Sequence, residues 1–183
     1  MKFCIECGND QVALKIPTGD NRHRYVCGSC NYIHYVNPRM ICGTLPIEGN
    51  KILLCKRAIE PRHSYWTLPA GFMENGESIE TAASRETLEE AMATSLNPKL
   101  YCIFSLAHIN QVHIFYKCDI VDGHFGAGSE TLDAQLFAVD DIPWNQIAFK
   151  TVEQCLKHYI QDRQSNHFPV RAEDIIPDLQ NHD

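Results

Sequence analysis

The sequence predicts an α/β domain with a mixed sheet, preceded by a small metal-stabilised module at the N-terminus. Four cysteines near the start of the chain stand as two Cys-x2-Cys pairs, a spacing typical of a zinc site. The remaining sequence mixes short apolar runs with two helical stretches, as expected of a sheet covered by helices. The length of 183 residues suits one sizeable domain plus a small one.

The N-terminal module is predicted to be a zinc ribbon. Its ligands are Cys4, Cys7, Cys27 and Cys30. Gly8 and Asn31 follow the two pairs, and both residue types tolerate the left-handed backbone that a tight metal knuckle requires. Four thiolates leave no open position for water, so the Zn²⁺ is expected to be structural and to supply folding energy. Two disulfides, or iron in the same cage, are the alternatives.

The rest of the chain divides by composition. We expect a zinc ribbon, a linker, a main domain and a polar C-terminal tail over residues 1–34, 35–39, 40–162 and 163–183. Strands of the main domain are expected at residues 40–45, 51–57, 65–68, 99–107, 111–121 and 135–139. One helix should run from about Ser78, its cap, to Ala91, and an amphipathic helix should cover 151–162. The glycine-rich stretch 122–133 should be a loop that carries Glu130 and Asp133.

Five further cysteines lie outside the predicted ribbon. They are scattered among apolar neighbours, which favours small buried hydrophobic side chains over nucleophiles: Cys42, Cys55, Cys102, Cys118 and Cys155.

Charge and hydropathy limit the classes of partner. The net charge is −7 and no run of Lys or Arg occurs, which argues against a surface that coats nucleic acid. No apolar run approaches transmembrane length, so no membrane partner is expected. Met1-Lys2-Phe3-Cys4 leads directly into the metal motif, so we expect no signal peptide and a cytoplasmic protein. The sequence leaves the oligomeric state open, a homodimer included.

The most informative stretch lies between residues 71 and 93. Carboxylates and one arginine stand there at fixed spacing: Glu77, Arg85, Glu86, Glu89 and Glu90. At about 100° per residue, Glu89 and Glu90 lie about 60° and 40° to either side of Glu86, so the three share one helix face. Such carboxylates repel one another unless a cation lies between them, and hard oxygen ligands suit Mg²⁺ or Mn²⁺. A solvated helix with Glu–Arg pairs is the alternative.

This spacing resembles the Nudix box, G-x5-E-x7-R-E-U-x-E-E-x-G-U, in which U is aliphatic. Gly71 and the five charged residues just named occupy the box positions. Thr87, Met92 and Ala93 depart from it at positions that shape the packing and the end of the helix. The resemblance implies a Nudix α/β/α sandwich over about residues 38–162 and hydrolysis of nucleoside diphosphates linked to another group.

The resemblance also implies roles for individual residues. Glu86, Glu89 and Glu90 would hold the metal, with the Gly71 carbonyl as a further ligand. Glu77 and Arg85 would hold the loop against the helix.

The general base is implied to be Glu86 or Glu130. Contacts to the diphosphate are expected from Arg57, Arg62 or His63. An aromatic ring that stacks on the base or flavin is expected from Phe72, Tyr65 or Phe104.

The ribbon ahead of the box narrows the substrate. NADH pyrophosphatases carry an S-Q-P-W-P-F-P-x-S motif after the box, and Thr94-Ser95-Leu96-Asn97-Pro98-Lys99 lacks it. The chain is more similar to plant plastid-type FAD/ADP-ribose pyrophosphatases through Cys4–Gly8, Tyr35–Met40, Leu53–Arg57, Trp66–Gly71, Glu130–Leu132, Leu136–Ala138 and Asp141–Pro143. This implies cleavage of FAD to FMN and AMP, or of ADP-ribose to AMP and ribose 5-phosphate. A NADH pyrophosphatase and a non-catalytic nucleotide-binding protein are the alternatives.

Overall fold

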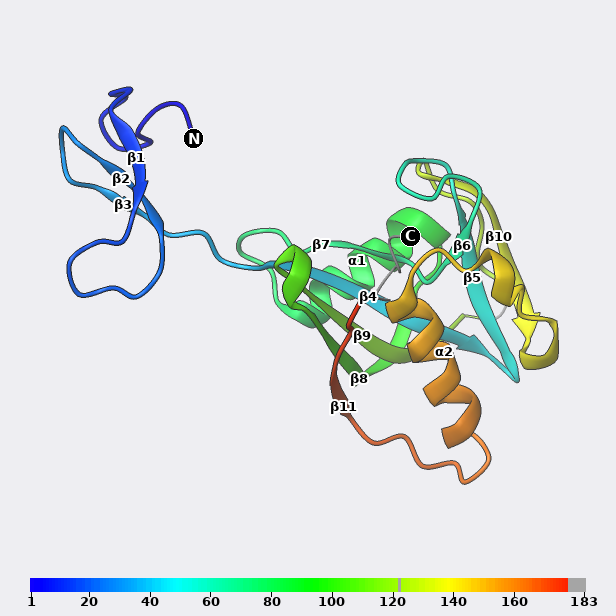
Figure 1. The fold of residues 1–183 in the computed structure, drawn as a ribbon. Helices are drawn as coiled ribbons and strands as arrows, with labels where there is room; N and C mark the ends of the chain where they lie inside the picture. Colours follow the sequence, from blue (N-terminus) through cyan, green and yellow to red (C-terminus); the bar gives the residue numbers. More distant parts are fainter. Residues whose placement is uncertain (122, 178–183) are drawn as a thin grey trace, which may run out of the picture. The chain divides into compact units, whose positions relative to one another are not determined.

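The computed structural model describes residues 1–121 and 123–177 and divides the chain into two compact units. The first covers residues 1–37 and the second begins at Pro38 (Figure 1).

The first unit is a small antiparallel sheet. Its strands are β1 (Val12–Lys15), β2 (Arg24–Cys27) and β3 (Ile33–His34), paired in that order. Val26 is the only branched aliphatic side chain buried within residues 1–37, all of which the structure describes, whereas Phe3 and Leu14 are more than half exposed. So little buried apolar surface cannot hold a module of this size together, and a metal is needed as its core.

The second unit is built on a mixed sheet. Its strands are β4 (Arg39–Glu48), β5 (Lys51–Arg57), β6 (Trp66–Thr67), β7 (Ala70–Phe72), β8 (Ser95–Leu106), β9 (Gln111–Ile120), β10 (Thr131–Ala138) and β11 (Arg171–Asp174). The order across the sheet is β10-β5-β4-β9-β8-β11, with β6 paired to β5 and β7 to β4. The β4–β9 and β8–β11 pairs are parallel and the others antiparallel, which confirms the expected mixed sheet.

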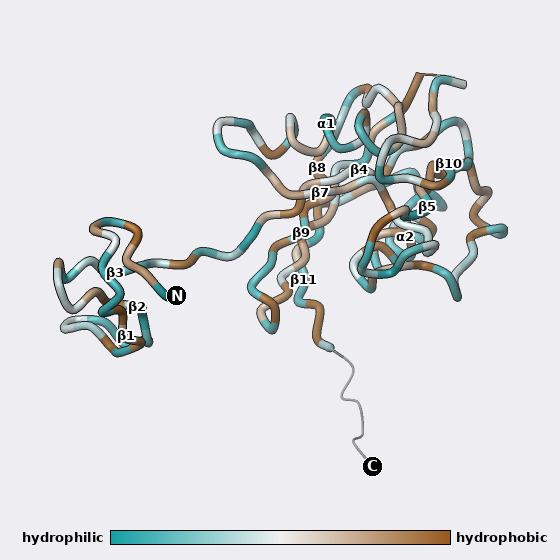
Figure 2. The backbone as a smooth tube through the Cα atoms, turned by 90° about the horizontal axis from the view of Figure 1, so that it is seen from above, coloured by the Kyte–Doolittle hydropathy of each residue, from teal (hydrophilic) through white to brown (hydrophobic). Residues whose placement is uncertain are grey.

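Two helices cover the sheet from opposite faces: α1 (Ile79–Ala91) and α2 (Lys150–Asp162), as the two views in Figures 1 and 2 agree. On the α2 face, Val152, Cys155 and Leu156 pack against strand residues that include Leu45 and Phe115. On the other face the buried contacts of α1 are small, Ala82 and Ala83 against Cys42, so this helix lies close to the sheet. The short 3₁₀ helices η1 (Ala107–Ile109), η2 (Val139–Asp141) and η3 (Trp144–Gln146) complete the unit.

The start of α1 follows the sequence prediction. Ser78 is the N-cap, and its hydroxyl accepts the backbone N–H of Thr81 at 3.1 Å. Met92 ends the helix in the left-handed region with φ of 49°, a conformation that favours glycine, the residue this box position normally holds. Thr87, which replaces an aliphatic box residue, is fully buried and hydrogen-bonds the buried Thr44.

Three elements differ from expectation. Strand β10 begins at Thr131 because its ladder with β5 extends to Arg57, so Asp133 lies in a strand and not in a loop. Strand β7 was not expected, and it forms because the residues after Pro69 pair with β4. Strand β8 begins at Ser95, since a register shift absorbs Pro98 within the ladder.

The stretch expected to be a polar tail contains a strand. Arg171–Asp174 (β11) pairs in parallel with β8, from Arg171 opposite Cys102 to Asp174 opposite Ser105. Residues 178–183 of the same stretch lie outside the described residues. Among the helices that the structure describes, none combines the length and the apolar character required to cross a bilayer.

All five cysteines outside the first unit are buried, as predicted: Cys42, Cys55, Cys102, Cys118 and Cys155.

Candidate active site

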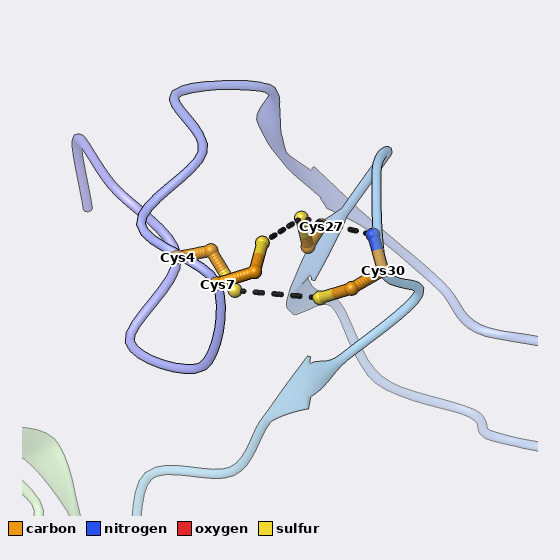
Figure 3. Close-up of side chains that lie close together, drawn as sticks. All are labelled: Cys4, Cys7, Cys27 and Cys30. Atoms are coloured by element: carbon orange, nitrogen blue, oxygen red, sulfur yellow. Dashed lines mark hydrogen bonds between the residues drawn. The ribbon is translucent and has the colours of Figure 1, made fainter.

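The four cysteines of the first unit converge as a metal site would require. Their sulfur atoms all lie within 4.8 Å of one another, and the Cys4–Cys30 and Cys7–Cys27 Sγ–Sγ distances are both 3.7 Å (Figure 3). A tetrahedron of Zn–S bonds near 2.3 Å has an edge of about 3.8 Å, so the spacing fits zinc. Gly8 and Asn31 have φ of 70° and 59°, the left-handed conformation predicted for both knuckles.

In the second unit, Arg85 joins the loop after β7 to helix α1. Its guanidinium donates to both carboxylate oxygens of Glu77, at 2.8 and 3.1 Å, and to the Phe72 carbonyl at 3.1 Å. The same group donates to Glu86 at 2.7 Å and to Glu89 at 3.0 Å. These contacts raise the pKa of Arg85, with the Glu77 hydrogen bonds the largest cause. Arg85 therefore positions two of the three clustered carboxylates.

Glu90 is the most enclosed of the three carboxylates. Its Oε2 atom accepts the backbone N–H of Ala70 at 3.0 Å, which ties α1 to the start of β7. The pKa of Glu90 is raised to about 7, chiefly by burial and also by the Glu86 and Glu130 charges, while the Ala70 hydrogen bond and Arg57 oppose this rise. Burial likewise raises the pKa of Glu86, against the effect of Arg85. A cation at this position would remove the cost of holding these groups ionised.

Gly71 allows the close approach of α1 to the loop. A Cβ atom built on Gly71 would lie 2.4 Å from the carboxyl group of Glu86, nearer than atoms can pack. The position of the Glu86 carboxylate therefore requires a glycine at the first box position. The backbone of Gly71 lies directly beside that carboxylate.

The glycine-rich loop after β9 is docked on the C-terminal end of α1. The N–H groups of Gly126 and Gly128 donate to the carbonyls of Ala91 and Glu90, at 2.8 and 3.0 Å, and satisfy orphan acceptors of the helix end. A Cβ on Gly128 would lie 1.7 Å from the Glu89 carbonyl oxygen, so only glycine fits there. The loop brings Glu130 close enough for its charge to raise the pKa of Glu86 and Glu90.

These groups line one cleft of about 1350 Å³. The sequence-predicted residues on its walls are Gly71, Arg85, Glu86, Glu89, Glu90, Glu130, Arg57, Arg62 and Phe72. Arg57 donates from Nε to the Pro61 carbonyl at 2.9 Å, and its guanidinium lies 5.0 Å from the ring of Phe149. The cleft thus places the arginines and the acidic cluster along the walls of one cavity.

Three other candidates lie elsewhere. Phe104 is completely buried in the core against Phe115, which excludes it as a stacking residue. The expectation for Phe104 was wrong because an apolar strand residue carries no sign of the face on which it lies. His63 and Tyr65 are not on the cleft walls; His63 hydrogen-bonds Ser64, and the Tyr65 ring lies 5.3 Å from the Arg62 guanidinium.

Several wall residues were missed in the sequence. They come from the β8–β9 connection, the start of α2 and the chain after β11: Leu106, His108, Ile109, Gln111, His113, Phe149, Lys150, Thr151, Ile175 and Pro177. No local motif marks them, because they meet only when strands distant in sequence end at the same edge of the sheet. One sign of these wall residues is present in the sequence: residues 108–110 stand between two expected strands.

The chemistry of the acidic cluster suits a divalent cation, since carboxylate and carbonyl oxygens are its preferred ligands. Among the residues that the structure describes, only the four cysteines have three or more ligand atoms drawn together within 4.8 Å. Glu86 and Glu89 are instead held by Arg85, and Glu90 by the Ala70 N–H. The side chain of Glu89 is 57% exposed at the cleft, so it has room to turn toward a cation.

Comparison with known proteins agrees with the geometry. The zinc-ribbon family described as Nudix N-terminal matches residues 2–36, and the NUDIX domain matches residues 38–155. A crystal structure of a NUDIX hydrolase from Nitrosomonas europaea is 46% identical with a TM-score of 0.91, over 96% of this chain and 99% of that one.

Two curated relatives carry named activities. An ADP-ribose pyrophosphatase of Methanocaldococcus jannaschii is 30% identical over 139 residues, which are 71% of this chain and 78% of the relative. A NAD-capped RNA hydrolase NudC of Vibrio parahaemolyticus is 28% identical over 171 residues, which are 88% of this chain and 62% of the relative. The chain thus spans less than two thirds of the length of that second relative.

Proposed function

This chain belongs to the Nudix hydrolase family and carries the family's N-terminal zinc ribbon. We propose that it hydrolyses the pyrophosphate bond of a nucleoside diphosphate linked to another group. The observation that supports the proposal best is the placing of Glu86, Glu89 and Glu90 beside Arg57 in a single large cleft. Carboxylates for a cation and arginines for phosphate oxygens are the groups that phosphoryl chemistry needs.

Nudix enzymes generally use divalent metals, and we assign Mg²⁺ or Mn²⁺ to Glu86, Glu89 and Glu90, with the Gly71 carbonyl beside them. When bound, the cation neutralises the diphosphate and lowers the pKa of a coordinated water. Glu77 and Arg85 keep the loop and the helix in register, as their hydrogen bonds indicate. Zn²⁺ on the four cysteines has a structural role.

For the general base we retain two residues, Glu86 and Glu130. Both residues line the cleft, and Glu130 is the more exposed of the two. Glu130 ends its loop, and its backbone carbonyl accepts the N–H of Ala58 at 2.9 Å, which holds this end of the loop in place. Arg57 and Arg62 lie on the same wall and are assigned to the phosphate oxygens.

The proposed substrates are ADP-ribose and FAD. The name of the archaeal relative supports ADP-ribose, and the sequence resemblance to the plant-type enzymes supports FAD. NADH or another NAD-derived group is the second candidate, favoured by the NudC relatives and opposed by the missing post-box motif. All of these substrates carry two bulky groups on a diphosphate, and the volume of the cleft suits such molecules.

Turnover of ADP-ribose, FAD and NADH with Mg²⁺ or Mn²⁺, with the products separated by chromatography, tests the proposal. AMP as a common product would support cleavage within the diphosphate. The highest kcat/KM would rank the substrates, and the Glu90→Gln variant serves as the inactive control. Binding of all three without cleavage would replace the hydrolase by a nucleotide-binding protein.

A further inference from the structure

Strand β11 extends the sheet at the end of the cleft farthest from Arg57. The order β5-β4-β9-β8-β11 places four strand spacings between Arg57 and the segment after β11. At about 4.8 Å per spacing the two walls lie about 19 Å apart, the length scale of a nucleotide with two end groups. Ile175 and Pro177, which directly follow β11, line this end of the cleft.

A partly buried ion pair holds the segment in place. Arg171 donates through both terminal nitrogens to Asp162 at the end of α2, and the Tyr101 hydroxyl donates to the same carboxylate at 2.7 Å. Although burial opposes it, these hydrogen bonds lower the pKa of Asp162. Glu173 adds a contact to His158 at 3.0 Å, and the Ile175 N–H donates to the Ser105 carbonyl at 2.9 Å. The wall is therefore an ordered part of the sheet.

The two ends of the cleft differ in charge. Around Arg57 the walls carry arginines and glutamates. At the other end Lys150, at the start of α2 and beside Thr151, is a charged wall residue. The seven wall residues from the β8–β9 connection and the β11 end include no Asp, Glu, Lys or Arg: Leu106, His108, Ile109, Gln111, His113, Ile175 and Pro177. Figure 2 shows the hydrophobic stretch that follows β11. A wall of this kind accepts an uncharged group in preference to a phosphate.

The polar atoms at this end are held in fixed directions. The Gln111 Oε1 atom can only accept, so His113 Nε2 carries the proton of their 3.0 Å hydrogen bond. The other ring nitrogen, Nδ1, then accepts the Thr151 hydroxyl at 3.1 Å. This pairing fixes the amide plane of Gln111 and leaves its nitrogen to donate to a ligand.

From this arrangement we propose that the β11 end is a subsite for a planar nitrogen heterocycle, the base or ring on one side of the diphosphate. Ile175, with Leu106 and Ile109, covers the ring, and Gln111 contacts its edge. The proposal rests on the proposed function, because it assigns one end of the same cleft. It makes Ile175 a residue that sets which end groups are accepted, although it lies outside the part matched by the NUDIX domain family.

The neighbouring isoleucines provide a matched pair of variants. Ile175 lines the cleft, while Ile176 is 76% exposed and is not on its wall. The probe is the methylene analogue of ADP-ribose, in which CH₂ replaces the bridging oxygen and prevents hydrolysis, with Mg²⁺ present. Calorimetry should find that Ile175→Trp lowers the affinity for the analogue by roughly tenfold or more, that Ile175→Ala lowers it less, and that Ile176→Ala leaves it unchanged.

A second probe separates ring contact from general damage. Methylenediphosphonate has the two phosphorus groups and no ring, so its affinity should be the same in all variants. Equal loss for both probes, or Ile175 variants that bind the analogue as wild type does, would overturn the subsite. If Ile175→Trp does not fold, as judged by its thermal transition, Ile175→Ala carries the test.

Failure of the proposed function has a different signature. Wild-type protein that binds the analogue with the expected Ile175 dependence, but cleaves no substrate, would support the subsite and contradict the hydrolase. Wild-type protein that does not bind the analogue would overturn the subsite.

Discussion

The carboxyl group of Glu86 lies so close to Gly71 that a Cβ atom there would stand 2.4 Å from it. Replacing Gly71 by alanine must therefore displace the Glu86 side chain or the loop. We expect Gly71→Ala to lower kcat/KM by about 100-fold, the scale of a displacement of about 1 Å at a catalytic group.

The control for this variant is Gly126→Ala in the docked loop. Its Cβ would meet only the Met92 side chain, at the ordinary contact distances of 3.5 and 4.0 Å, so activity should stay within a fewfold of wild type. Steady-state kinetics of both variants make the comparison, and an active Gly71→Ala enzyme would contradict the role given to this contact.

Thr87 and Thr44 form a buried hydroxyl pair at 2.6 Å between α1 and β4. Thr87 donates to the Ala83 carbonyl at 2.8 Å, so Thr44 donates to Thr87. Thr87→Val removes the hydroxyl that accepts from Thr44 and should lower the free energy of unfolding by about 1–2 kcal/mol. The double variant Thr44→Val/Thr87→Val should lose less than the sum of the single variants in urea denaturation. Strict additivity would show that the pair contributes no coupling.

His113 predicts a pH dependence of stability. Burial lowers its pKa to about 4, below the value of about 6.5 expected in the unfolded chain. The unfolded state therefore binds more protons between these values, so this contribution is complete above pH 6.5 and is lost as the pH falls to 4. Its full size is at most about 3–4 kcal/mol.

The measurement is the free energy of unfolding from pH 7.5 to 4 for wild type and His113→Gln. Carboxylates titrate in the same range, so the difference between the two curves is the quantity of interest. That difference should shrink toward low pH, and parallel curves would contradict a neutral buried histidine.

The cysteine cluster predicts one zinc per chain. Metal analysis of purified protein should find one equivalent, and Cys7→Ser should lose it because three thiolates bind far more weakly than four. Cys118→Ala removes a buried cysteine of the second unit and should keep the zinc. If the Cys7→Ser variant kept its zinc, the zinc would not be bound by this cysteine cluster.

Much of this architecture could be predicted because its signals are local. The Cys-x2-Cys pairs gave the ribbon, and the box spacing gave α1 with Ser78 as its cap. The left-handed turns at Gly8 and Asn31 in the two knuckles also follow from residue type.

Other features depend on partners distant in the sequence. Strand β11 looks like a polar tail because its four residues, Arg-Ala-Glu-Asp, have little strand propensity, and it forms through the Arg171–Asp162 pair and the ladder to β8. Phe104 and Phe72 are both aromatic strand residues, yet the first is core and the second is half exposed at the cleft. Only the assembled sheet separates them.

In the proposed function, the carboxylates of α1 hold the cation for pyrophosphate cleavage. Glu80 lies on the same helix, is exposed and is not on the cleft wall, so Glu80→Gln is a matched control for Glu90→Gln. AMP release from ADP-ribose by protein that keeps its zinc but is freed of Mg²⁺ and Mn²⁺ should begin only on addition of Mg²⁺ or Mn²⁺, persist in Glu80→Gln and fall by at least about 100-fold in Glu90→Gln. Equal rates in the two variants, or release in the presence of excess chelator, would contradict the account.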